Sequence, residues 1–305
     1  MKTTFALCLF ILASGLYAEA SFETLEKAQK AADKSGKGIF LISYAIVPGD
    51  RTNAQIQFTA AINEDEAIAA NADTFELAVV NCFSLAHKDN QCVNPALAES
   101  YGWPCTVSVY APGATKHLWR KEMSHDSTSG RKEHSKEEIA DAMNEAAEKY
   151  AAFQAPIDKL NERLEADKDL KNDVQMQVDL ADAWAKGFVA AKAREHYDEA
   201  IKLTKKNDKA DPNIESLSWQ ACEAEYACEA WSLAQDSFID FSKDFKDSDK
   251  AWQARIMAAK AQAKGGDEKG AVSALEKIVK DKKATAAHDA ARAAIEELTG
   301  KKAAD

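Results

Sequence analysis

Cysteine thiols are the side chains of this chain with the clearest capacity for chemistry, as redox partners, nucleophiles or disulfide bridges. Beyond residue 20 the cysteines are Cys82, Cys92, Cys105, Cys222 and Cys228. Disulfides persist in an oxidising compartment, and an odd number of cysteines leaves at least one thiol without an intramolecular partner. A bridge between Cys82 and Cys92 would close a short loop and stabilise the fold by about 2–3 kcal/mol. It requires Cα atoms within about 7 Å, so a bridged and an open pair both remain possible at this stage.

Cys222 and Cys228 fall on one predicted helix, six residues apart. Six helical steps raise the chain by about 9 Å and turn the second side chain away from the first. The two thiols therefore cannot bridge without unwinding the helix. We expect both to be buried in helix packing.

No other residues form a recognised catalytic or metal-binding pattern. The six histidines lack the close spacing of a zinc site, and His125-Asp126 with His134 is interpreted as part of a solvated loop. A phosphate-binding loop, a dinucleotide fingerprint and a Gly-x-Ser-x-Gly elbow are all absent from the sequence. We therefore expect no metal site and no cofactor.

The charge balance argues against nucleic acid as a partner. The chain has 50 acidic and 39 basic residues, which gives a net charge of −11, and the lysines are interleaved with the acids. Such a surface repels a phosphate backbone.

The first twenty residues have the order of a secretory signal peptide. Lys2 precedes an apolar run from Phe5 to Tyr17, and Ala18-Glu19-Ala20 is a small-x-small cleavage site. The apolar run is shorter than the roughly 20 residues that span a bilayer. Cys8 lacks the small residues that precede a lipidated cysteine. We expect cleavage near Ala20, no transmembrane segment after it, and export to the periplasm, with secretion from the cell as the alternative.

The composition changes near residue 135, from β-rich runs with four of the six prolines to Ala, Glu and Lys at helical spacing. The first part predicts an alternation of helices and strands, which implies a mixed sheet with helices on both faces. The predicted helices are Phe22 to Ala32, Asn53 to Ala72 with a break near Asn63, and Ser135 to Phe153. The predicted strands are Ile39 to Ala45, Phe75 to Phe83, Thr106 to Tyr110 and His117 to Lys121.

This order, with several local features, resembles the thioredoxin fold over roughly residues 22 to 150. The run Leu97-Ala98-Glu99-Ser100-Tyr101-Gly102 resembles the stretch before the family's cis-proline. Pro104 precedes Gly113 by nine residues, the spacing between cis-proline and hairpin glycine in the family. The resemblance implies a cis-proline at Pro104 and a thioredoxin-like domain over residues 21–153.

The sequence departs from the family at its redox centre. Thioredoxins carry Trp-Cys-x-x-Cys after the first central strand, where a helix N-terminus lowers the thiol pKa. The corresponding loop here contains Pro48, Gly49, Asp50 and Arg51 and has no sulfur. Dithiol–disulfide exchange is therefore not expected in its usual form. Cys105, next to Pro104, is either a small half-buried residue in the place of the family's threonine or a lone nucleophile.

Residues 154–305 resemble tetratricopeptide repeats. Leu180-Ala181-x-x-Trp184 and Ala193-x-x-x-Tyr197-x-x-Ala200 follow that family's pattern of small and large positions, in which small residues let paired helices approach. The small position recurs at Ala234 and Ala271, in steps of 41 and 37 residues, longer than the usual 34. The tryptophans at helical packing positions are expected to be core residues: Trp184, Trp219, Trp231 and Trp252.

These observations predict an exported, non-catalytic binding or scaffold protein. Its partner would be a protein or peptide of the cell envelope, held beside Pro104 or in the helical concavity. The alternative is a thiol-dependent oxidoreductase or isomerase that uses Cys105, and a third possibility is a domain whose groove has no ligand.

Overall fold

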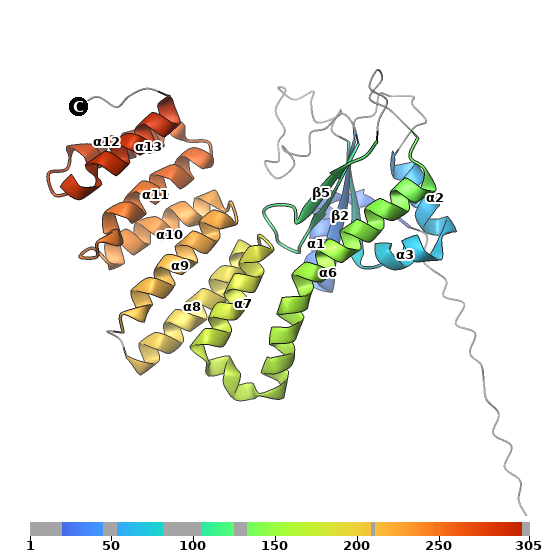
Figure 1. Cartoon of the computed structure of the whole chain (residues 1–305), viewed down its shortest axis with the longest axis horizontal. Coiled ribbons are helices and arrows are strands. Elements are labelled where there is room, and N and C mark those ends of the chain that lie inside the picture. The colour runs from blue at the N-terminus through green and yellow to red at the C-terminus, as the bar shows by residue number, and fades with distance from the viewer. Residues whose placement is uncertain (1–19, 45–53, 82–104, 125–132, 209–210, 301–305) are drawn as a thin grey trace, which may run out of the picture.

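A computed structural model describes residues 20–44, 54–81, 105–124, 133–208 and 211–300. It has a five-stranded mixed sheet with helices on both faces, followed by a series of helices (Figure 1). The predicted combination of an α/β part and a helical part is confirmed at this level. Among the described residues, no helix has the length and apolar character needed to cross a membrane.

The sheet has the order β1-β3-β2-β4-β5. Its strands are β1 (Glu23–Thr24), β2 (Gly38–Tyr44), β3 (Phe75–Asn81), β4 (Thr106–Tyr110) and β5 (Trp119–Glu122). β3 pairs in parallel with β1 and β2, whereas β4 is antiparallel to both β2 and β5. β1 was not predicted, since a two-residue edge strand leaves no periodic signal.

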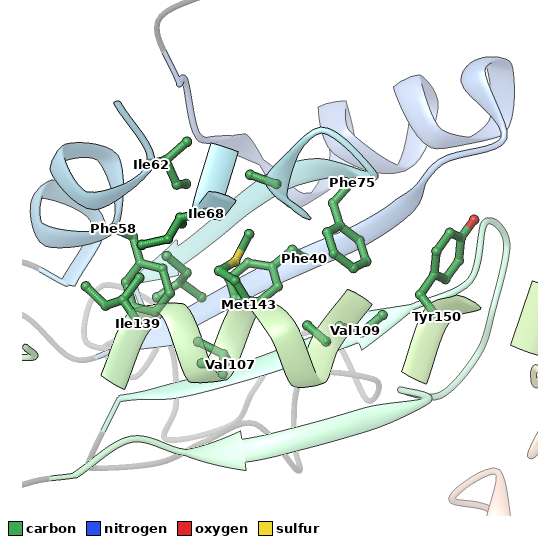
Figure 2. Packing of buried hydrophobic residues seen from close by; sticks show 14 of the residues in the cluster. Phe40, Phe58, Ile62, Ile68, Phe75, Val107, Val109, Ile139, Met143 and Tyr150 are labelled. Atoms are coloured by element: carbon green, nitrogen blue, oxygen red, sulfur yellow. The ribbon is translucent and has the colours of Figure 1, made fainter. Parts of the chain in front are cut away.

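Alternate residues of β2 face opposite sides of the sheet. Ile39 and Leu41 pack with Ala28 and Ala32 of α1 (Leu25–Ser35). Phe40 and Ile42 belong to the main core on the other face, which is covered by α2 (Ala54–Glu64), α3 (Glu66–Ala72) and α6 (Lys136–Ala166). Figure 2 shows side chains of this core, among them Phe40, Phe58, Ile139 and Met143, between the sheet and the helices.

Local chemistry sets several helix boundaries. α1 ends at Gly36, whose φ of 74° is a left-handed conformation that glycine adopts without strain. The predicted break near Asn63 lies at Asp65, whose side chain accepts hydrogen bonds from the Ala67 and Ile68 amides and so begins α3.

The predicted end of a helix at Phe153 was wrong, because α6 continues to Ala166 through Pro156. Proline removes one intrahelical hydrogen bond. Pro156 and Ala152 are both exposed, so the Ala152 carbonyl that loses this bond is open to water. Buried Ile157 extends the apolar face of the helix beyond Phe153. The predicted boundary between residues 153 and 154 therefore lies inside one continuous helix.

The helical part consists of successive helices that pack on their neighbours (Figure 1). After the 3-10 turn η1 (Lys168–Asn172) they are α7 (Val174–Lys186), α8 (Ala190–Asn207), α9 (Asn213–Ala227), α10 (Trp231–Asp244), α11 (Lys250–Lys264) and α12 (Glu268–Lys280). The 3-10 turn η2 (Thr285–Ala287) precedes α13 (His288–Thr299).

The turns after α7, α9 and α11 repeat one hydrogen-bond pattern. Phe188, Glu229 and Gly266 all have positive φ. The backbone amide of each donates to the carbonyl three residues earlier, and the amide of the residue that follows donates to the carbonyl five residues before its own position. This is a Schellman ending of the helix. The three turns follow one another at intervals of 41 and 37 residues. These intervals equal those predicted from the buried small residues Ala193, Ala234 and Ala271. The repeat spacing is confirmed, with helix pairs α7/α8, α9/α10 and α11/α12.

The sheet part and the first helix pair share a core. The main core includes Phe153 and Ile157 of α6 together with Ala183 and Val189, and the rings of Phe153 and Trp184 pack edge to face at 6.0 Å.

The connection between β4 and β5 contacts two of the repeated turns. Thr115 bonds to the Phe188 carbonyl through its amide (3.0 Å) and its hydroxyl (3.2 Å), and the hydroxyl also contacts the Cys228 carbonyl. Lys116 Nζ lies 2.6 Å from Glu229 Oε1. The two turns that contact the sheet part have side chains at their left-handed positions, whereas the third turn has Gly266.

Candidate functional site

Most of the residues predicted to form a thioredoxin-like site lie outside the described part of the chain. This holds for the loop residues Pro48, Gly49, Asp50 and Arg51, for the proposed cis-proline Pro104, and for the possible disulfide Cys82–Cys92. Those predictions stay untested.

Cys105 is the residue that precedes β4. Its backbone carbonyl accepts a hydrogen bond of 2.8 Å from the Met123 amide, and its side chain is half-buried against the main core. The neighbouring Thr106 pairs with Ser43 near the carboxyl end of β2. Cys105 therefore lies beside the carboxyl end of β2.

Cys222 and Cys228 are buried, with 3% and 0% of their surfaces exposed, which confirms the prediction. Burial raises the pKa of Cys222 to about 12 and that of Cys228 to about 11, and the nearby Glu225 carboxylate adds to both shifts. Cys222 occupies the same repeat position as the buried Ala181 and Ala259. These thiols fill space between helices and are poor nucleophiles.

The helical part contains a pocket between α10 and α12, with α11 beneath it. Its volume is about 280 Å³. Ala258 and Ala259 of α11 form the base, and their small side chains leave the space open. Ile239 of α10 and Ile278 of α12 line its apolar walls. We call this space the α11 pocket.

Trp252 connects the α11 pocket to a second space of about 520 Å³ between α11 and α13, because its side chain lines both. Trp252 was predicted as a core residue and is so only in part: it packs against the C-terminal core cluster but stays half-buried, as do Trp184 and Trp231. Trp219, by contrast, is buried as predicted. Half-exposed aromatic rings beside apolar pockets are common anchors in recognition.

At the equivalent position of the preceding repeat, charged and polar side chains form hydrogen bonds across the space between the helices. Arg194 of α8 donates to Glu225 of α9 (3.2 Å), to Ser237 of α10 (2.7 Å) and to Asp198 of its own helix (2.7 Å). Glu225 is only 2% exposed, and burial raises its pKa even though Arg194 and Ser237 favour the ionised form. We call Arg194, Glu225 and Ser237 the repeat-two plug.

The repeat shift places Gln235, Gln262 and Ala274 where Arg194, Glu225 and Ser237 stand one repeat earlier. All three replacements line the α11 pocket. Gln262 donates instead to Asp267 at 2.6 Å. The repeat that holds the α11 pocket therefore lacks the residues of the repeat-two plug. This difference can be read from the sequence once the repeats are aligned.

Two cations lie at the rim of the α11 pocket. The Arg255 guanidinium stacks on the Trp252 ring at 4.3 Å, and Lys277 projects from α12. Neither forms an ion pair with any residue that the structure describes, whereas the neighbouring Lys260 pairs with Glu297 at 2.7 Å. Asp281 is the acidic residue of the lining, and its carboxylate accepts a hydrogen bond from the Lys283 amide.

The described residues bring together no group of three side chains that could hold a metal ion. His134 lies 3.4 Å from Glu138, and its predicted companions His125 and Asp126 fall outside the described ranges. The candidate site consists of the α11 pocket and the space between α11 and α13.

Comparisons with protein-family models, with curated proteins and with solved structures find no match for this chain.

Proposed function

We propose that this chain is an exported, non-catalytic binding protein of the cell envelope. In this proposal a thioredoxin-like domain without its redox dithiol supports tetratricopeptide-like helices that bind a protein or peptide partner. The periplasm is the proposed compartment. The observation that carries the proposal is Trp252, half-exposed between two partly apolar spaces on opposite sides of α11.

Three features support this proposal. Stacked helix pairs with a constant turn geometry offer extended interaction surface. Over the described residues, the mixed sheet and its helices are compatible with an α/β domain of the kind that the thioredoxin resemblance implies. The turns at Phe188 and Glu229 fasten the helical part to the sheet part, which limits the freedom lost when a partner binds.

Capture from an envelope fraction tests the proposal when it is done with matched variants. The mature chain, Trp252→Ala and Leu233→Ala serve as baits. Leu233 is a large apolar residue, 49% exposed, that lines neither space around α11. We expect one partner to be retained by the wild type and by Leu233→Ala and lost with Trp252→Ala. The purified partner should then bind the Trp252→Ala chain at least about tenfold more weakly, as is typical of a buried aromatic anchor.

A partner held equally by all three baits would contradict the proposal, provided that circular dichroism shows Trp252→Ala to be folded. Cys105→Ser separates the thiol-based alternative. Binding that survives this variant agrees with the proposal, whereas disulfide exchange by the wild type that Cys105→Ser abolishes would favour an enzyme.

A further inference from the structure

We infer that the α11 pocket binds an apolar side chain accompanied by a carboxylate on a polypeptide segment. This inference rests on the proposed binding function and names the chemistry that the pocket selects.

The repeat-two plug shows what this place in the repeat accommodates. There the chain itself supplies a cation, Arg194, and a carboxylate, Glu225, and the two lie 3.2 Å apart with little exposure of the carboxylate. A buried carboxylate needs such a partner because desolvation disfavours its charged form.

In the α11 pocket the ion pair of the plug is not kept, because Gln235 stands at the position of Arg194, but two other cations line the pocket. Gln262 stands at the position of Glu225, while Arg255 and Lys277 lie at the rim without ion-pair partners in the described structure. Asp281 offsets only one of these two positive charges. The remaining charge is complementary to an anion on the ligand.

The rest of the pocket selects an apolar group. Ile239, Ala258, Ala259, Ala274 and Ile278 line its base and walls, with the Trp252 ring at one side. A volume of about 280 Å³ has room for one large apolar side chain with the carboxylate at the rim. The carboxylate can belong to an acidic residue next to the apolar one or to the chain terminus after it.

Fluorescence anisotropy with labelled octapeptides and the full mature chain tests this inference. One amidated peptide carries a central leucine flanked by glutamates. In two others glutamine or lysine replaces the glutamates, and in a fourth glycine replaces the leucine. A fifth peptide ends in leucine with a free carboxylate. The glutamate and free-terminus peptides together show whether side-chain or terminal carboxylates are used.

We expect at least one of the two carboxylate-bearing leucine peptides to bind about tenfold more tightly than the glutamine, lysine and glycine peptides. Arg255→Gln combined with Lys277→Gln should remove that preference. A triple variant, Gln235→Arg with Gln262→Glu and Ala274→Ser, transfers the repeat-two plug into the pocket and should abolish binding. Circular dichroism and Tm establish that both variants fold.

Equal affinity for the glutamate, glutamine and lysine peptides would overturn the inference, as would binding that survives the triple variant. Absence of binding by all five peptides would overturn it too. In each case a partner whose capture still depends on Trp252 would show that the proposed function itself stands.

Discussion

Gly187→Ala tests whether the sheet part and the helical part share one core. Gly187 lies at the end of α7 with φ of −89°, a conformation open to alanine, so the backbone adds no strain. A Cβ atom at this position would lie 2.0 Å from Cε2 and 2.6 Å from Cζ of Phe153. The effect of the substitution is therefore a steric one between α6 and the turn after α7.

The size of the effect follows from how tightly Phe153 is held. Its ring lies 6.1 Å from that of Tyr150 and 6.0 Å from that of Trp184, so it cannot turn aside without displacing them. Overpacking of a core costs about 1–3 kcal/mol, and we expect the upper half of that range here. Phe153→Leu removes Cε2 and Cζ, the two ring atoms closest to the added Cβ, and by itself costs about 1 kcal/mol. The double variant should therefore be less destabilised than the sum of the two single variants.

Urea unfolding followed by far-UV circular dichroism and tryptophan fluorescence measures these free energies. Gly265→Ala is the matched control, because Gly265 has the same place in the third repeated turn with φ of −75° and no atom closer than 3.4 Å to an added Cβ. The control should be neutral or stabilising by up to about 1 kcal/mol. Two results would refute a contact between Gly187 and Phe153 in solution. One is a loss of stability in Gly187→Ala no greater than that in the control. The other is additivity of the effects of Gly187→Ala and Phe153→Leu within about 0.5 kcal/mol.

Two further predictions concern buried groups of the helical part. Cys222 and Cys228 have pKa values raised to about 12 and about 11, so both should resist iodoacetamide at pH 8 in the native chain and react after unfolding. Mass spectrometry locates the adducts, and rapid labelling of either thiol in the native chain would contradict their burial. Burial raises the pKa of Glu225 above its unfolded value of 4.5, so the native state binds this proton more tightly than the unfolded state does. The stability of the wild type relative to Glu225→Gln should therefore increase as the pH falls from neutral towards 4.5 and level off below it. Urea unfolding across this pH range measures the difference, and the reverse trend would contradict a raised pKa for Glu225.

The sequence anticipated features that depend on local pattern. The continuous apolar run from Ile39 predicted β2, because a strand buried on both faces needs apolar residues at every position. The spacing of Ala193, Ala234 and Ala271 predicted the repeat, because close helix approach needs a small residue at a fixed place. The step of 41 and then 37 residues reappears in the turns at Phe188, Glu229 and Gly266.

The candidate site was less accessible from the sequence. Trp252 fits a helical packing position as well as a pocket rim, and periodicity does not distinguish the two. Gln235, Gln262 and Ala274 come from three helices, and their significance appears only beside the repeat-two plug. α6 likewise continues past Pro156 because Ile157 packs in the core, a long-range term that local propensity omits.

The sequence by itself determined the strands and helices around their apolar patterns, the repeat spacing and the burial of Cys222 and Cys228. These follow from periodicity, which links residues a few positions apart. The tertiary structure alone decided that Thr115 and Lys116 contact the repeated turns, that Gly187 lies against Phe153, and that Gln235, Gln262 and Ala274 line one pocket. Those outcomes depend on side chains that are distant in the chain and meet only after the helices have packed.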